Sequence, residues 1–259
     1  RFYTKFLHDI GVVDFDEPFK KLFNQGMING KNGIKMSKSK GNVVSPDDLV
    51  RDYGCDALRM YELFVGPPEL DAEWDDRGIE GVARFLNRFY NLVMDSKDKD
   101  IKETKEMVKL RHKLVYDIET RFNQFSLNTV VSGFMEYCNK LTDVAKKEGG
   151  IDKETLKTFV ILLAPFTPHL GEELWRELGG TDSVFHVTWP ECDEEAMKDD
   201  EIEVAVQVNG KVKAVIMVPA DIAKEDAIAA GKAAVEGKIT GNIVKEIYVP
   251  KKIVNLVVK

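Results

Sequence analysis

Apolar residues recur at helical spacing through the middle of the chain. Between residues 79 and 93 they stand three and four positions apart, which predicts a long amphipathic helix with one buried face. Similar stripes predict further helices, at 107–122, 127–145, 156–163 and 168–178. Because the breaks between these helices are short, we expect them to form an antiparallel helical bundle over residues 77–190.

The hydrophobic spacing changes near the end of the chain. Apolar and polar residues alternate over 204–208 and again over 212–218, on either side of Asn209-Gly210. Asn-Gly between two alternating runs is a strong signal for a β-hairpin. The elements expected next are one helix and two strands, at 225–235, 243–249 and 253–258. This pattern predicts a small α+β domain over residues 202–259.

The start of the chain has neither pattern for long. A short helix over the first ten residues precedes glycine-rich turns, and Ser45 and Pro46 then predict a helix that Ser45 caps and Gly54 ends. One further helix follows it. The predicted fold is therefore multidomain and mainly α, with successive parts at 1–45, 46–76, 77–190, an acidic linker at 191–201, and 202–259.

Composition narrows the class of protein. The 259 residues are 44% hydrophobic, which is enough for one or two cores and too much for a disordered chain. No apolar run approaches the roughly 20 residues of a membrane helix, and no basic-then-apolar leader starts the chain, so we expect a cytoplasmic protein without a membrane partner. The three cysteines are few and far apart, which argues against a disulfide framework and a zinc site.

Charge is unevenly distributed along the chain. The net charge of −7 divides into about +2 for residues 1–59, −11 for 60–200 and +2 for 201–259. A polyanionic partner would be attracted to the two ends, or to local stripes on the acidic middle. Ordinary variation along a solvated chain explains the same distribution, and on charge alone it is the favoured interpretation.

The most specific motif is Lys35-Met36-Ser37-Lys38-Ser39. A given pentamer arises by chance in a chain of this length roughly once in 10,000 sequences. The motif lies between Gly33 and Gly41, which allow the backbone to fold around a ligand. Its two ammonium groups and two hydroxyls suit the oxygens of a triphosphate. The alternative is a solvated Lys/Ser loop without a ligand.

This pentamer and the residues before it resemble a known family. With Glu17-Pro18-Phe19 and residues 25–28, the motif resembles the end of the catalytic domain of class I aminoacyl-tRNA synthetases. The resemblance places a KMSKS loop at 35–39 and the edge of a Rossmann-like catalytic domain over 1–45. Asn29 to Ile34 form a short link where many bacterial members carry an inserted domain.

The rest of the chain is similar to the leucyl-tRNA synthetases within that class. Residues 53–59 and 78–86 are similar to their stem-contact region and first bundle helix, and residues 164–170 to the last helix of their anticodon-binding bundle. The tail, at 206–212 and 248–251, resembles the C-terminal tRNA-binding domain of the bacterial members. Because isoleucyl and valyl relatives share the loop and the bundle, this tail decides for leucine.

The resemblance implies adenylate chemistry. ATP and leucine react to leucyl-adenylate and pyrophosphate, and leucine then passes to tRNA(Leu). The loop, residues 35–39, would bind ATP, with Lys38 as the catalytic phosphate contact in the transition state and Lys35 as a weaker one; Met36, Ser37 and Ser39 complete the site. Mg²⁺ is expected with ATP, but no residue looks like its dedicated ligand, so no metal site is assigned. We expect a monomer.

Other parts of the family's site are missing from the sequence. His8-Asp9-Ile10-Gly11 resembles the second class I signature only loosely, and a helix ended by Gly11 is the better interpretation. The adenosine-binding signature, the leucine pocket and the editing domain are expected upstream of Arg1. Since Arg1 is not Met and begins an uncapped helix, we expect a piece of a longer protein that is inactive alone.

Six basic residues are candidates for tRNA contacts. Arg84 and Arg88 are four apart on the first bundle helix and could follow a phosphate backbone, although solvation explains them equally well. The others flank the predicted strands: Lys211, Lys213, Lys251 and Lys252. If the sheet brings these four together they form a basic patch; alternatively, lysines on edge strands prevent aggregation.

Two other interpretations stay open. The chain could be the natural tRNA-binding subunit of a split synthetase, which a start at Met in a loop would favour. It could also be a stand-alone tRNA-binding or regulatory protein with an inactive loop, although both lysines of the pentamer are present.

Overall fold

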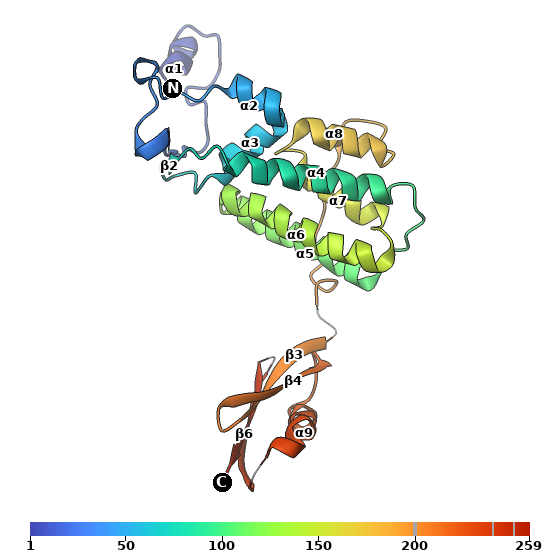
Figure 1. The fold of residues 1–259 in the computed structure, drawn as a ribbon. Helices are drawn as coiled ribbons and strands as arrows, with labels where there is room; N and C mark the ends of the chain where they lie inside the picture. Colours follow the sequence, from blue (N-terminus) through green and yellow to red (C-terminus); the bar gives the residue numbers. More distant parts are fainter. Residues whose placement is uncertain (199–200, 240, 251) are drawn as a thin grey trace. The chain divides into compact units, whose positions relative to one another are not determined.

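The computed structural model describes residues 1–198, 201–239, 241–250 and 252–259. The chain divides into two compact units, Arg1–Ala196 and Met197–Lys259, hereafter the first and the second unit (Figure 1). Among the described helices, none combines the length and the apolar character that crossing a membrane requires.

The first unit is helical and confirms the helices expected from the hydrophobic pattern. Its α-helices are α1 (Phe2–Asp9), α2 (Pro46–Tyr53), α3 (Cys55–Phe64), α4 (Gly78–Ser96), α5 (Lys105–Asn123), α6 (Leu127–Glu148), α7 (Lys153–Leu163) and α8 (Pro168–Glu177). The shorter elements are β1 (Ile28–Asn29), η1 (Lys31–Gly33), η2 (Lys38–Lys40), β2 (Ala72–Glu73) and η3 (Val184–His186). Helices α4, α5 and α6 lie side by side in Figure 1.

Side chains and glycines set the ends of several helices. Thr104 caps α5 by accepting a hydrogen bond from the amide of Met107, and Asp152 caps α7 in the same way at 2.9 Å from the amide of Thr155. Gly149 ends α6 in the left-handed conformation, with φ of 84°. At α2 the expectation was wrong in one respect, because the Ser45 hydroxyl makes no capping bond. Pro46, which has no amide hydrogen to satisfy, begins that helix instead.

One hydrophobic core holds the helices of the bundle together. Phe89 from α4 stacks on Phe159 from α7, with ring centroids 4.2 Å apart, and Phe134 from α6 lies 5.5 Å from Phe159. All three side chains are fully buried. Met60 extends the same core into α3. By contrast, none of the first 25 residues is buried.

The second unit is a four-stranded sheet with one helix. Its elements are β3 (Glu201–Val208), β4 (Lys211–Pro219), α9 (Lys224–Val235), η4 (Glu236–Lys238), β5 (Ile243–Val249) and β6 (Ile253–Val258). The strand order is β4-β3-β6-β5, with β3 and β6 parallel in the centre. Helix α9 packs on the sheet where Gly231 lies so close to Val254 that a Cβ would approach it to 2.9 Å. The predicted hairpin, helix and strands are all confirmed.

Replacing Phe159 by alanine should destabilise the first unit by about 3–5 kcal/mol, because it removes a fully buried ring that stacks on Phe89 and contacts Phe134. Tryptophan fluorescence during urea unfolding measures this unit alone, since all three tryptophans lie in it. Phe185→Ala, which removes an exposed ring, is the control and should change the free energy by less than about 0.5 kcal/mol. Equal effects of the two substitutions would contradict the assigned core.

Candidate functional site

The loop that carries the pentamer 35–39 starts from a paired base. Gly26 crosses the chain at Leu70 so closely that a Cβ would stand 2.1 Å from the Leu70 carbonyl oxygen, and only glycine fits there. Just beyond, Ile28 of β1 pairs with Ala72 of β2 in parallel. The amide of Trp74 donates to the carbonyl of Asn29 at 2.9 Å. The segment before the pentamer is therefore fastened to residues more than forty positions later.

A turn then leads from this base to the pentamer. The amide of Asn32 donates to the Glu73 carboxylate at 2.6 Å, and the amide of Gly30 donates to the carbonyl of Ile34 at 2.9 Å. Asn32 and Gly33 both have positive φ, which asparagine and glycine tolerate best. These contacts form a turn between Gly30 and Ile34, directly before the pentamer.

Asn42 holds the two sides of the loop together. Its side-chain oxygen accepts a hydrogen bond from the amide of Ser37 at 2.8 Å, and its Nδ2 donates to the carbonyl of Lys35 at 3.3 Å. A primary amide can satisfy a donor and an acceptor at once, which no carboxylate can do. Sequence reasoning did not single out this residue, although an asparagine directly after the glycine that follows the loop was the available signal.

The pentamer has an anchored part and an exposed part. Met36 packs against the hydrophobic core of the first unit, and Ser37 is half-buried. The Ser37 and Ser39 hydroxyl oxygens are 2.8 Å apart. Lys35 and Lys38 are exposed, and neither forms an ion pair with another residue that the structure describes. The loop thus presents two uncompensated ammonium groups on a fixed base.

The residues of the loop do not suit a magnesium ion. Within the described part of the chain there is no group of three or more His, Cys, Asp or Glu side chains that could hold a metal. The pentamer offers ammonium groups and hydroxyls, whereas Mg²⁺ prefers carboxylates and phosphates. Its ammonium groups and hydroxyls suit the oxygens of an anion better than a cation.

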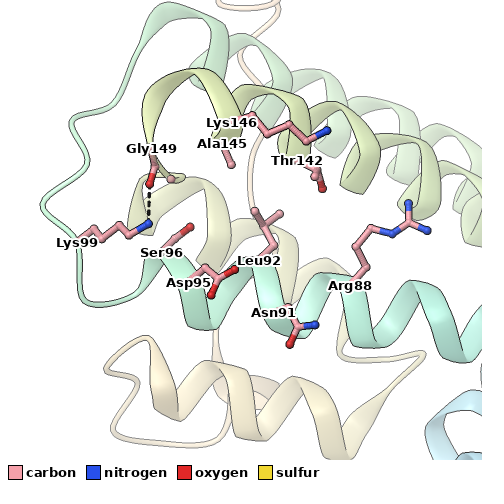
Figure 2. Close-up of a pocket in the computed structure, with 11 residues that line it drawn as sticks. Arg88, Asn91, Leu92, Asp95, Ser96, Lys99, Thr142, Ala145, Lys146 and Gly149 are labelled. Atoms are coloured by element: carbon pink, nitrogen blue, oxygen red, sulfur yellow. Dashed lines mark hydrogen bonds between the residues drawn. The ribbon is translucent and has the colours of Figure 1, made fainter.

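Helix α4 places its two candidate arginines differently. Arg84 is exposed, and its Nε lies 3.4 Å from the Glu80 carbonyl oxygen of the same helix. Arg88 instead reaches across to α6, where its guanidinium donates to the side-chain oxygen of Asn139. Only Arg88 therefore lies against a second helix, and it lines a cavity between α4 and α6 (Figure 2).

The second unit separates its candidate lysines. Lys211 and Lys213 lie together at the start of β4, where Lys211 pairs with Val208. Lys252 lies before β6, and its carbonyl accepts from the amide of Ala205, so β3 stands between it and β4. Ile253 pairs with Ala205, so Lys252, one residue earlier, lies level with position 204 of β3. Lys211 is level with Val208, four positions further along. The two lysines are therefore about 13 Å apart along the strand direction. Lys251 lies outside the described residues.

Asp56 of α3 contacts the start of α8. Its carboxylate accepts from the amide of Leu170 at 2.7 Å and contacts the His169 imidazole at 2.8 Å, at the start of α8. His169, in the first turn of α8, thus takes part in a helix-terminus contact.

Two family models match the chain. Residues 2–75 match the model for tRNA synthetases class I (I, L, M and V), and residues 104–228 match the anticodon-binding domain of tRNA ligase. The first includes the pentamer and its base, and the second extends from α5 into the second unit.

Similarity to individual proteins extends over the whole chain. This chain is 45% identical to the leucine–tRNA ligase of Fervidobacterium nodosum, 46% identical to that of Petrotoga mobilis and 43% identical to that of Chlorobaculum parvum. The chain is a homologue of the leucine–tRNA ligases. It spans about a third of the length of these relatives, 34%, 34% and 33% respectively.

A solved structure of a leucine–tRNA ligase has the same fold. The ternary complex LeuRS-tRNA-LeuAMS of Agrobacterium radiobacter K84 superimposes with a TM-score of 0.76 at 32% identity, covering all of this chain and 35% of that one. The likeness supports the helical architecture with small sheets described above.

Replacing Asn42 by alanine should loosen the loop, because it removes the acceptor of the Ser37 amide and the donor to the Lys35 carbonyl. Loss of about 1.4 kcal/mol, within the range for a hydrogen bond, would accelerate exchange of the Ser37 amide about tenfold. Hydrogen exchange of a peptide over 35–42 measures this. Ser39→Ala, which removes only the hydroxyl contact, should leave that rate nearly unchanged; equal rates in the two variants would contradict the role of Asn42.

Proposed function

We propose that this chain is the C-terminal part of a leucine–tRNA ligase, which activates leucine with ATP and transfers it to tRNA(Leu). The observation that carries the proposal is the pentamer loop, whose two lysines are exposed and unpaired while its backbone is fastened by Asn42. Similarity to leucine–tRNA ligases along the whole chain supports the choice of amino acid.

The loop would act on the first step of the reaction. The leucine carboxylate attacks the α-phosphorus of ATP, the bond to the bridging oxygen breaks, and pyrophosphate leaves with the electron pair. Negative charge increases on the phosphoryl oxygens as this happens. A lysine that reaches these oxygens only in the transition state lowers the barrier more than one that merely binds ATP. We assign this role to Lys38, with Lys35 as a ground-state contact.

The anchored residues of the loop would set the direction of these lysines. Met36 packs against the core, whereas Lys35 and Lys38 are exposed. The Ser37 and Ser39 hydroxyls can donate to further phosphate oxygens. Mg²⁺ would accompany ATP, held by the phosphates of the nucleotide.

The remaining parts of the chain would bind tRNA. Residues 104–228, which include α5–α8 and the first part of the second unit, match a domain named for anticodon binding, and the solved relative was crystallised with tRNA. The proposed contacts are Arg84, Arg88, Lys211, Lys213 and Lys252, and Lys251 outside the described residues. We further propose that the complete ligase is a cytoplasmic monomer and that this part is inactive without the remainder.

A natural subunit of a split ligase is the second candidate function. The relatives carry the matching region inside single chains about three times as long. This arrangement favours one continuous ligase over two subunits.

In a complete ligase that contains this chain, Lys38→Ala should slow leucine-dependent ATP–pyrophosphate exchange by about 10²–10³-fold, because it removes a charge that stabilises the transition state. Affinity for tRNA(Leu) should change by less than about twofold. Lys40→Ala is the matched control, since it removes a neighbouring exposed lysine of η2 outside the pentamer.

Two results would contradict this assignment. Equal losses of exchange and of tRNA affinity in Lys38→Ala would place Lys38 in the tRNA interface. Equal losses of exchange in Lys38→Ala and Lys40→Ala would show that the loop acts only through its total charge.

A further inference from the structure

The groove between α4 and α6 has the composition of a phosphate-binding site. It encloses a cavity of about 290 Å³, lined by Arg88, Asn91 and Asp95 of α4, Thr142 and Lys146 of α6, and Lys99, among others. Figure 2 shows the Lys146 side chain reaching along α6 toward Thr142, with Arg88 across the groove on α4. Three cations and one carboxylate line this cavity, although residues 60–200 as a whole are acidic.

Neighbouring carboxylates compensate the positive charge of the groove only in part. Arg88 is held by the neutral amide of Asn139 and forms no ion pair with a described residue. Burial raises the pKa of the neighbouring Cys138 thiol to about 11, so this group stays neutral and does not compensate Arg88. Lys146 pairs with Asp143 at 2.8 Å, but both side chains are exposed, and such pairs contribute little.

One end of the groove is already closed. At the end of α6, Lys99 donates to the carbonyl of Gly149 at 2.7 Å (Figure 2). The last turn of a helix carries partial negative charge, which disfavours an anion at that end. Lys99 compensates this charge and is therefore already engaged. The part of the groove suited to anions therefore runs from Arg88, past the Thr142 hydroxyl, to Lys146.

The length of this part selects the kind of ligand. From Asn139, which holds Arg88, to Lys146 the helix rises by about 10 Å. Each strand of duplex DNA carries about one negative charge per 3.4 Å of helix axis, so a groove of about 10 Å can contact more than one backbone phosphate and exceeds a single phosphate ion. We propose that the groove binds the phosphate backbone of RNA through Arg88 and Lys146.

This inference rests on the proposed function, and it makes that function more specific. It takes the tRNA as the RNA, assigns the bundle contact to Arg88 and not to Arg84, and adds Lys146, which the sequence did not single out. Arg84 does not line the cavity and contacts only its own helix.

The test is the salt dependence of binding between the 259-residue chain and unmodified tRNA(Leu). Each phosphate contact contributes about 0.7–0.9 to the slope of log K against log salt. Arg88→Gln and Lys146→Gln should each lower the slope by that amount, and the double variant by about twice as much. Lys147→Gln is the matched control, because Lys147 is an exposed neighbour outside the cavity that lies 3.8 Å from Glu106. It should leave the slope unchanged.

A variant of opposite sign guards against effects of misfolding. Asp95→Asn removes the one carboxylate that lines the cavity, and it should tighten binding about two- to fivefold through loss of repulsion. A damaged fold would weaken binding in every variant, and circular dichroism checks that each remains helical.

The outcomes separate this inference from the proposed function. If the unaltered chain binds tRNA(Leu) and Arg88→Gln and Lys146→Gln leave the slope unchanged, the groove is not a phosphate site, while the proposed function stands. If the unaltered chain shows no salt-dependent binding to tRNA(Leu), the tRNA-binding part of the proposed function fails and the groove assignment fails with it. Weaker binding in Asp95→Asn, with its helical content retained, also overturns the inference.

Discussion

The position of the pentamer loop, residues 35–39, depends on a hydrophobic core that it shares with the helical bundle. Met36 packs against the same cluster that contains Phe89 and Phe159, and Ile28 and Val44 pack against it on either side of the loop. The first unit therefore does not consist of a loop attached to an independent bundle. Because the core fixes the backbone at Met36, the neighbouring lysines can move while their starting points do not.

Polar contacts of long sequence separation complete what the core begins. The Glu73 carboxylate accepts a hydrogen bond from the amide of Asn32, and the Asp56 carboxylate accepts one from the amide of Leu170 at the start of α8. Each joins segments that the chain order leaves far apart, and each uses a carboxylate to satisfy backbone amides. Such amides would otherwise lack partners at a turn and at a helix start. These contacts explain how a segment with little regular structure keeps a defined geometry beside the bundle.

The elements were predictable because their periodicity follows from burying one face. The stripe over 79–93 and the alternation around Asn209-Gly210 each required only neighbouring residues, and the structure confirms both elements. The pentamer was found for a different reason, the low chance of its occurrence. Neither signal contains the contacts that fasten the loop, since Asn42 and the crossing at Gly26 depend on which segments meet in space.

The placement of the basic residues shows the same limit. Helical spacing puts Arg84 and Arg88 on one side of α4. It does not predict that, of the two, Arg88 contacts a residue of α6 and Arg84 contacts its own helix. Strand spacing likewise does not give the order β4-β3-β6-β5, which places β3 between Lys211 and Lys252. Residue type and spacing identified candidates in both cases, and the arrangement of the elements decided which of them lie together.

The proposed loop and groove sites would attract anions in the same way, although the chain is acidic. With a net charge of −7, attraction over long distances is weak, and salt screens exposed charges beyond about 8 Å. Local cations therefore act most strongly where neutral groups, and not carboxylates, hold them. Asn42 fastens the backbone beside Lys35, and Asn139 holds Arg88, in each case through a neutral amide. An aspartate at either position would also accept a hydrogen bond, but it would cancel the positive charge that the site presents.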